Sequence, residues 1–217
     1  TAIHAVCEQS ALGNLEPENY AEYFDLAFLD ELKNLDEKPD NKMIVEMRKQ
    51  SRDIFHKVFP ALQELFPGYE VYSSEEDLYE PISELKFTRY LKGFIDLVVK
   101  TPDGKYHIID WKSCSWGWDM KRKSEPMTTY QLTLYKKFFC EKHNIDPEKV
   151  ETYFGLLKRT AKSDNVEIFR VTSGPRKTTN ALKVLTNACN LINKGITIKN
   201  RNSCAKCPFN NTEHCKR

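Results

Sequence analysis

The sequence predicts an α/β protein, because two pairs of strand-like runs are separated by a helical pattern. The first pair, residues 90–100 and 106–112, is rich in Ile, Val, Phe and Tyr and flanks a Pro-Asp-Gly turn, which is typical of a β-hairpin. The second pair is residues 150–157 and 166–171. Between the two pairs, residues 127–143 carry apolar side chains at helical spacing, so this helix is expected to pack on the sheet.

Further helices are expected before and after this unit, at residues 18–35, 41–66 and 175–194. The expected organisation is an N-terminal helical segment that packs on the core, the core itself and a cysteine-rich tail, with the bounds 1–40, 41–200 and 201–217. A chain of 217 residues suits one domain with a good-sized core and a small appendage.

Composition argues against some classes of protein and leaves others open. The chain has 33 basic and 31 acidic residues, a net charge of +2, so total charge argues neither for nor against a nucleic-acid partner. No apolar run approaches the length of a membrane span and no signal peptide is recognised, so no membrane partner is expected. Seven cysteines, three of them clustered near the end, indicate a metal site in a cytoplasmic, intracellular protein more than a disulfide framework.

Two acids interrupt the apolar runs of the predicted hairpin. Asp96 lies within the first strand, and Asp110 ends the apolar run of the second, with Lys112 two positions further on. A buried carboxylate is costly unless a cation or a donor compensates it. The simple alternative is that Asp110 pairs with Lys112, or that the acids mark strand ends. The hairpin, however, can bring Asp96 beside Asp110, with Lys112 on the same face, which predicts a site for a hard cation of the Mg²⁺ kind.

Three short motifs follow one another on strand, strand and helix. They are Gly93-x-x-Asp96, Asp110-x-Lys112 and Gln131-x-x-x-Tyr135. In this order they resemble the PD-(D/E)xK nucleases, specifically the RecB-like and Cas4-like branch, over about residues 41–160 and the cysteine tail. The resemblance implies a restriction-endonuclease-like core, in which a central mixed β-sheet is flanked by helices, with a small C-terminal cysteine-rich metal-binding tail.

The resemblance also implies roles for the residues of the hairpin. Asp96, Asp110 and the backbone carbonyl of Trp111 would hold Mg²⁺ or Mn²⁺, which polarises a phosphate and lowers the pKa of a bound water. Lys112 would orient that water and stabilise negative charge in the transition state. Together these residues would hydrolyse a phosphodiester bond.

The family also places an acid or a histidine from its first core helix at the metal. Glu46 is the first choice and His56 the second, the alternative being that Glu46 is a solvated residue paired with neighbouring cations. A glutamate of the first strand often approaches the metal as well. Glu75 or Glu76 could do so, although the polar run 73–77 is more typical of a solvated loop.

Substrate contacts are expected from the helix and from the loop that follows the second strand. The resemblance assigns Gln131 and Tyr135 to the substrate strand. In the loop, Trp116 and Trp118 offer rings that stack on bases, and Lys121 offers a cation for a phosphate. The alternative is that one tryptophan packs under the loop and the lysines are solvated.

The tail holds three cysteines with the spacing Cys204-x2-Cys207-x7-Cys215. Thiolates placed in this way bind zinc or an iron–sulfur cluster, but three ligands are one short. The resemblance to Cas4-like nucleases implies a [4Fe–4S] cluster whose fourth ligand is Cys7. Alternatively, His214 or Cys114 could complete a Zn²⁺ site.

The resemblance implies metal-dependent hydrolysis of DNA by an exonuclease that acts on single strands or on duplex ends. A helicase, or a recombination or replication partner, could accompany such an enzyme. Two alternatives stay open. One is a catalytically silent nucleic-acid-binding subunit with the same fold, and the other is a structure- or sequence-specific endonuclease of the same superfamily.

Overall fold

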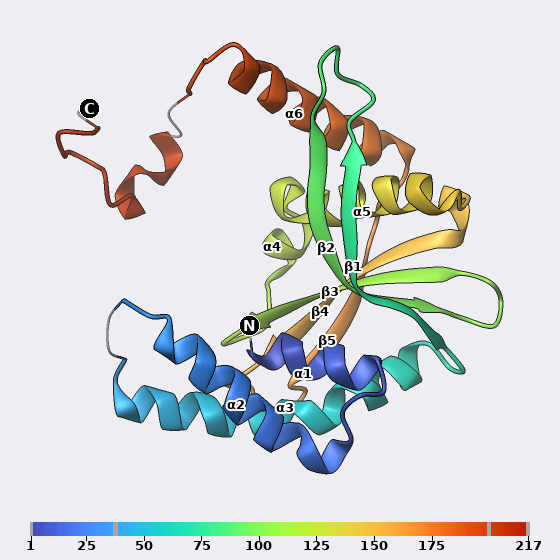
Figure 1. Ribbon diagram of the computed structural model, residues 1–217, viewed down its shortest axis with the longest axis vertical. Coiled ribbons are helices and arrows are strands. Elements are labelled where there is room, and N and C mark those ends of the chain that lie inside the picture. The colour runs from blue at the N-terminus through green and yellow to red at the C-terminus, as the bar shows by residue number, and fades with distance from the viewer. Residues whose placement is uncertain (1, 37–38, 199–200, 216–217) are drawn as a thin grey trace.

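The computed structural model describes residues 2–36, 39–198 and 201–215. Five strands form one sheet in the order β1-β2-β3-β4-β5 (Figure 1). The strands are β1 (Glu70–Pro81), β2 (Tyr90–Lys100), β3 (Tyr106–Cys114), β4 (Val150–Lys158) and β5 (Val166–Val171). The helices are α1 (Ala2–Ala11), α2 (Tyr20–Lys33), α3 (Asn41–Leu65), α4 (Met120–Ser124), α5 (Pro126–His143) and α6 (Pro175–Asn193), with short 3-10 turns η1 (Pro17–Asn19), η2 (Pro147–Lys149) and η3 (Arg201–Lys206). β3 and β4 pair in parallel and the other neighbours antiparallel, so the predicted α/β class with a mixed sheet is confirmed.

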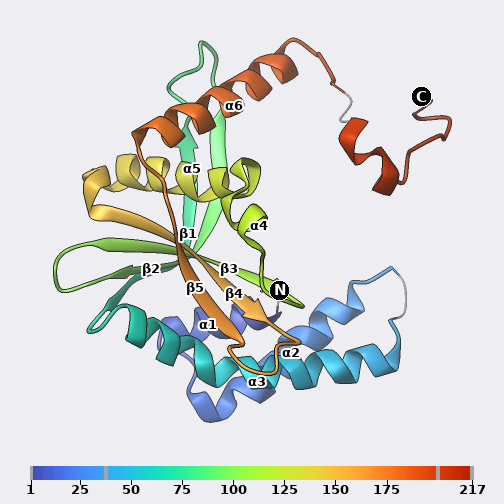
Figure 2. The ribbon, with the colours of Figure 1, turned by 180° about the vertical axis from the view of Figure 1, so that it is seen from behind.

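The helices form two layers, one on each side of the sheet. α1, α2 and α3 lie together on one face and α4, α5 and α6 on the other, as Figures 1 and 2 show from opposite sides. Successive side chains of a strand point to opposite faces of the sheet, so each face has its own hydrophobic core. Ile109 packs with the first layer and Ile108 with the second. In the part of the chain that the structure describes, none of these helices is long and apolar enough to cross a membrane.

Trp111 and Gly155 show how closely β3 and β4 are matched. The two residues are partners in the parallel ladder, and a Cβ at Gly155 would lie 2.2 Å from two carbons of the Trp111 ring. Trp111 is buried in the core of the α1–α3 layer. Only glycine leaves room for the ring, so Gly155 fixes the position of the residue that follows Asp110.

β2 and β3 pair only near their shared turn. The ladder joins residues 97–100 to residues 106–109 and ends where Leu97 faces Ile109. Beyond this point β2 continues with β1, whereas β3 continues with β4, so the sheet splits into two prongs (Figure 1). We call this split the fork.

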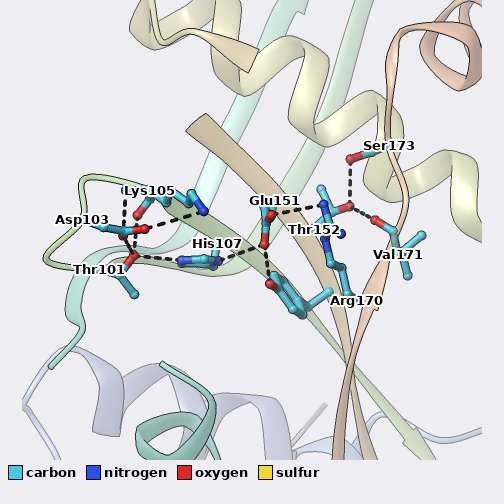
Figure 3. Close-up of polar contacts among 10 residues, drawn as sticks. Thr101, Asp103, Lys105, His107, Glu151, Thr152, Arg170, Val171 and Ser173 are labelled. Atoms are coloured by element: carbon cyan, nitrogen blue, oxygen red, sulfur yellow. Dashed lines mark hydrogen bonds and ion pairs between the residues drawn. The ribbon is translucent and has the colours of Figure 1, made fainter. Parts of the chain in front are cut away.

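The turn end of the β2–β3 hairpin is held by a polar network that reaches β4 and β5 (Figure 3). The Thr101 hydroxyl lies 3.0 Å from His107 Nε2, and His107 Nδ1 lies 3.9 Å from Glu151. Glu151 accepts a hydrogen bond from the Tyr153 hydroxyl at 2.6 Å and pairs with Arg170 at 3.1 Å. Burial lowers the pKa of His107, so its ring is neutral near pH 7. The hairpin is therefore anchored at one end and open at the other.

β1 includes a polar run that the sequence indicated as a loop. Residues 73–77, expected as a solvated loop, continue the strand because they pair with β2. Ser74 faces Leu97 and Glu76 faces Ile95, and Glu75 between them has a φ of 48°, in the left-handed region. The strand is thus locally distorted beside the end of the β2–β3 ladder.

We expect Gly155→Ala to lower the free energy of unfolding by about 1–3 kcal/mol, because the added Cβ collides with a ring that close packing holds in place. Urea unfolding followed by tryptophan fluorescence measures this change. Gly174→Ala is the matched control, since Gly174 has a φ of −77° and nothing lies within 4 Å of an added Cβ. Equal effects of the two substitutions would show that the contact with Trp111 is unimportant.

Candidate active site

Asp96 lies at the base of the fork, where the β2–β3 ladder ends. Its Oδ2 accepts a hydrogen bond from the backbone N–H of Trp111 at 2.6 Å. On the other side, Ser74 Oγ donates to the carbonyl of Asp96 at 3.1 Å. Asp96 is therefore held by both neighbouring strands, and its carboxylate satisfies a β3 donor beyond the last backbone pair.

Asp110 lies on the other prong of the fork and is almost wholly buried, with 2% of its surface exposed. Lys112 Nζ lies 2.6 Å from Asp110 Oδ2. Gln131 Nε2, on α5, donates to Asp110 Oδ1 at 3.0 Å. Lys112 Nζ also lies 5.8 Å from the centroid of the Phe154 ring. The structure thus brings a cation and an amide to the two oxygens of one buried carboxylate.

The three motifs of the sequence meet in one chain of contacts. Gln131 Nε2, which donates to Asp110, also donates to Tyr135 Oη at 3.0 Å. The Tyr135 ring lies against Gly93, where a Cβ would be 2.8 Å from Tyr135 Cε1. Gly93 is therefore the residue that lets Tyr135 approach β2. The motif on α5 therefore positions Asp110 and also faces the fork.

Burial raises the pKa values of the acids around the fork, and neighbouring negative charges add to the shift of Asp96 and Glu75. Burial raises the pKa of Asp96 to about 7, and the negative charge of Asp110 adds to the effect. Burial also raises the pKa of Asp110, although Lys112 opposes the shift. The pKa of Glu75 is raised first by burial and then by the charges of Glu8 and Asp110. A cation among these groups would relieve the repulsion between them.

Helix α1, which was not predicted from the sequence, closes the fork from the side of the α1–α3 layer. His4 Nδ1 lies 3.7 Å from Asp96 Oδ2. Burial lowers the pKa of His4 to about 4, so the imidazole is neutral near pH 7. Glu8 lies one turn further along α1, and its negative charge raises the pKa of Glu75. The spacing of four residues between His4 and Glu8 is the signal that could have identified this helix.

The fork fits a small hard cation. Asp96 and Asp110 offer carboxylate oxygens, and Asp110 Oδ2 accepts no aligned hydrogen bond within the described ranges although it is buried. The Trp111 carbonyl lies on the same strand edge as its N–H, so it also faces the fork. Among the residues that the structure describes, no three His, Cys, Asp or Glu side chains gather closely enough to hold a metal alone. Mg²⁺ commonly uses one or two carboxylates and keeps several waters, which suits this set.

Glu46 and His56 do not reach the fork, so their assignment to the metal is wrong. Glu46 is exposed on α3, and His56 stacks on Tyr20 with their ring centroids 5.5 Å apart. The reason is that α1, which was not expected, contacts β1 and β2, whereas α3 packs mainly on β5 and on α1. Glu76 also turns away, since it pairs with Lys142 at 2.6 Å.

The loop after β3 holds one exposed and one buried tryptophan. Trp116 is 70% exposed, whereas Trp118 is 8% exposed and packs on Phe154 with ring centroids 5.2 Å apart. The guanidinium of Arg122 covers the Trp118 ring at 4.5 Å. The assignment of Trp118 to the substrate is therefore wrong, because its ring fills the core beneath the loop. Lys121 is exposed on α4 and, with Trp116, is accessible to a substrate.

In the described part of the chain, Cys7 and the cysteines of the tail are not brought together as the metal clasp would require. Cys7 lies on the buried face of α1, and burial, followed by the charge of Asp96, raises the pKa of its thiol to about 12. A metal binds the thiolate, so such a thiol is a poor ligand. The tail lies well away from α1 in Figures 1 and 2. Among the described residues, the candidate ligands do not gather in a group of three, so neither the [4Fe–4S] cluster nor the Zn²⁺ alternative is supported; these ligands were Cys7, Cys204, Cys207, Cys215, His214 and Cys114.

A mixed sheet that splits between two acids, with a lysine beside one of them, is the arrangement expected for a metal-dependent nuclease. The family model of the PD-(D/E)XK nuclease superfamily matches residues 1–212, so the chain belongs to this superfamily. Its nucleases generally use Mg²⁺ or Mn²⁺. The matched range includes α1, which lies outside the residues on which the resemblance in sequence rested.

Comparison with solved structures gives a fold match. The chain is similar to a crystal structure from Eubacterium rectale named "Putative exonuclease", with 16% identity and a TM-score of 0.56 over 100% of this chain and 77% of that one. A second structure, named SSO0001, has 13% identity and a TM-score of 0.43. That match covers 72% of this chain and 65% of the other chain. At such identities the first likeness shows the fold alone. No curated protein matches the chain.

We expect Asp96→Asn to stabilise the metal-free protein at pH 8. The folded-state pKa of Asp96 lies above its ordinary value, so ionisation destabilises the fold as pH rises towards 7, and the amide avoids this while its oxygen still accepts from Trp111. The expected gain is about 1–2 kcal/mol, measured by thermal unfolding in EDTA. At pH 4 the gain should nearly vanish, because the folded wild type is then protonated.

Asp103→Asn is the control for this charge effect. The Thr101 hydroxyl lowers the pKa of Asp103, so loss of that charge should not stabilise the protein at pH 8. A gain of equal size in Asp103→Asn, or no gain in Asp96→Asn, would contradict the electrostatic explanation.

Proposed function

We propose that the chain is a deoxyribonuclease that hydrolyses phosphodiester bonds with Mg²⁺ or Mn²⁺ bound in the fork. The observation that carries the proposal is the convergence of Asp96, Asp110 and Lys112 where β2 and β3 separate. The two acids come from different strands, the negative charge of Asp110 raises the pKa of Asp96, and Lys112 Nζ lies 2.6 Å from Asp110. Membership of the nuclease superfamily supports the same activity.

Each group in the fork has a role in this reaction. Asp96, Asp110 and the Trp111 carbonyl would hold the cation, which when bound polarises the phosphate and lowers the pKa of a water. The neutral imidazole of His4 is suited to the same cation, because its lone pair is not protonated near pH 7. The ammonium of Lys112 orients the attacking water and stabilises negative charge on the phosphate in the transition state.

Gln131 and Tyr135 are positioning residues in this proposal. The amide of Gln131 donates to Asp110 Oδ1, which leaves Oδ2, beside Lys112, as the oxygen that would hold the cation. Tyr135 in turn accepts from the same amide and is seated on Gly93. Both also face the fork from α5, where they can contact the scissile strand.

An exonuclease acting on single strands or on DNA ends is the form of activity we favour. The exposed ring of Trp116 and the exposed ammonium of Lys121 lie in the segment that follows Lys112. Unpaired bases stack on exposed rings, whereas duplex DNA keeps its base faces covered. A helicase, or a recombination or replication partner, would supply such unpaired ends.

The activity is tested with end-labelled single-stranded and duplex DNA in Mn²⁺, Mg²⁺ or EDTA. We expect metal-dependent products from the wild type and a loss of at least about 100-fold in Lys112→Ala, which removes a charge that acts in the transition state. Glu46→Gln is the control, because Glu46 is exposed on α3 away from the fork and should cleave like the wild type.

Two further measurements make the result decisive. Thermal unfolding shows whether Lys112→Ala still folds, and Asp96→Asn, which retains the acceptor for Trp111, provides a second inactive variant. A covalently closed circle separates the two modes of cleavage, because only an endonuclease opens it. DNA binding without cleavage under every metal condition would overturn the proposal in favour of a catalytically silent binding subunit.

We expect Gly93→Ala to lower kcat by about 10- to 100-fold with little change in KM, because it displaces Tyr135 and, through it, the amide that positions Asp110. Steady-state cleavage with a short single strand measures both constants. Gly117→Ala is the matched glycine control, since its Cβ would be 3.4 Å from the flexible side chain of Lys158. A rise in KM alone would show that Gly93 acts on substrate binding instead.

A further inference from the structure

The ribbon formed by β1 and β2 beyond the fork has an exposed face with no role in the chemistry described above. Three cross-strand pairs have both partners exposed: Asp77 with Phe94, Tyr79 with Lys92, and Pro81 with Tyr90. The residues that alternate with them face α5, since Leu78 is buried and Gly93 lies against Tyr135. We call the six exposed residues the ribbon face.

Aromatic rings make up half of the ribbon face. Tyr79 is 58% exposed, and Tyr90 and Phe94 are each 46% exposed. The rings of Tyr79 and Tyr90 are stacked, with centroids 4.7 Å apart and planes inclined by 6°. Large exposed rings gathered in one place are typical of a binding surface, because they cost solubility without adding to the core.

Cations accompany these rings. Lys92 Nζ lies 5.9 Å from the centroid of the Phe94 ring, within the face itself. Towards the β1–β2 turn, Lys86 and Arg89 are exposed. Asp77 is the only acid among the six residues of the ribbon face. Rings beside positive charges meet the two requirements for binding a single nucleic-acid strand, which are stacking on bases and contact with phosphates.

The ribbon face leads into the proposed active site. Phe94 precedes Asp96 by two residues on β2, a distance of about 7 Å along a strand. Lys92 and Tyr90 lie further out on β2 at the same two-residue spacing, towards a turn that projects beyond α6 in Figure 1. The face therefore runs from the first acid of the fork to the edge of the molecule.

We propose that the ribbon face binds the single-stranded part of the DNA substrate and guides it into the fork. Bases stack on Phe94 and on the Tyr79–Tyr90 pair, and phosphates lie near Lys92. This inference rests on the proposed nuclease function and names the path of its substrate. A single strand fits better than a duplex because only unpaired bases present their faces to the rings, and the cations favour a polyanion over an apolar protein partner.

Binding is tested in EDTA with the full chain carrying Asp96→Asn, so that the strand is not cut. The probe is a fluorescent oligo-dT of about 12 nucleotides, and its affinity is read by anisotropy at fixed salt. We expect Phe94→Leu and Tyr79→Leu each to weaken binding about tenfold, because they keep apolar bulk and remove the ring. Phe94→Tyr keeps a ring and should bind like its parent.

The remaining variants control for charge and for loss of any exposed ring. Lys92→Ala should lower the slope of log affinity against log salt concentration by about 0.7, the value for one phosphate contact on a single strand. Phe209→Ala removes a ring that is 56% exposed in the tail, away from β2, and should leave affinity unchanged. Thermal unfolding confirms that each variant folds.

The following outcomes would overturn the inference that the ribbon face binds the strand. Unchanged affinity in Phe94→Leu and Tyr79→Leu, or no binding by the parent, shows that the ribbon face does not hold the strand. Equal losses with a blunt duplex point to phosphate contact without stacking. A dimer that dissociates on either substitution shows that the face joins two copies of the chain. Cleavage by the otherwise wild-type enzyme is scored separately, so that the nuclease proposal can stand while the ribbon face fails, or the reverse.

Discussion

The structure depends on how the chain accommodates two acids where its central hairpin opens. Asp96 satisfies the Trp111 N–H with a carboxylate, and the β2–β3 ladder stops after four pairs. Both acids are buried enough for their pKa values to rise, so the metal-free fork destabilises the fold. Lys112 and the amide of Gln131 offset part of this cost by contacting Asp110. Under the proposed function, the arrangement weakens the sheet but presents two carboxylates to one cation.

Packing around the fork supplies the stability that the fork itself lacks. Gly155 seats the Trp111 ring and Gly93 seats the Tyr135 ring, so each prong is held by an aromatic residue that only glycine can accommodate. At the closed end of the hairpin, His107 and Glu151 link the turn to β4. Glu75, whose φ is positive, lies on β1 beside the open end. This distribution is what is expected when local rules of folding are broken for function.

Local patterns in the sequence predicted the hairpin and its acids because alternation, turn chemistry and motif order are properties of short segments. The same information could not assign α1. Whether residues 2–11 or residues 41–65 lie next to β2 depends on how three helices pack, and this decides between His4 and Glu46. Burial of Trp118 likewise depends on Phe154, which lies on another strand. The spacing of the tail cysteines is a local pattern, but the sequence does not show that Cys7, the expected fourth ligand, is buried in the core.

The two prongs explain why the proposed substrate contacts fall on segments that are distant in the sequence. One prong is the β1–β2 ribbon, whose exposed rings precede Asp96, and the other is β3, whose end leads through Lys112 to Trp116. A strand that lies in the fork must touch both prongs, because the acids sit where they join. Rings on each side of the cation site would hold bases on both sides of the scissile phosphate. In the proposed mechanism the split in the sheet therefore provides both the cation site and the path of the substrate, because the β2–β3 pairs that are missing beyond Leu97 leave both open.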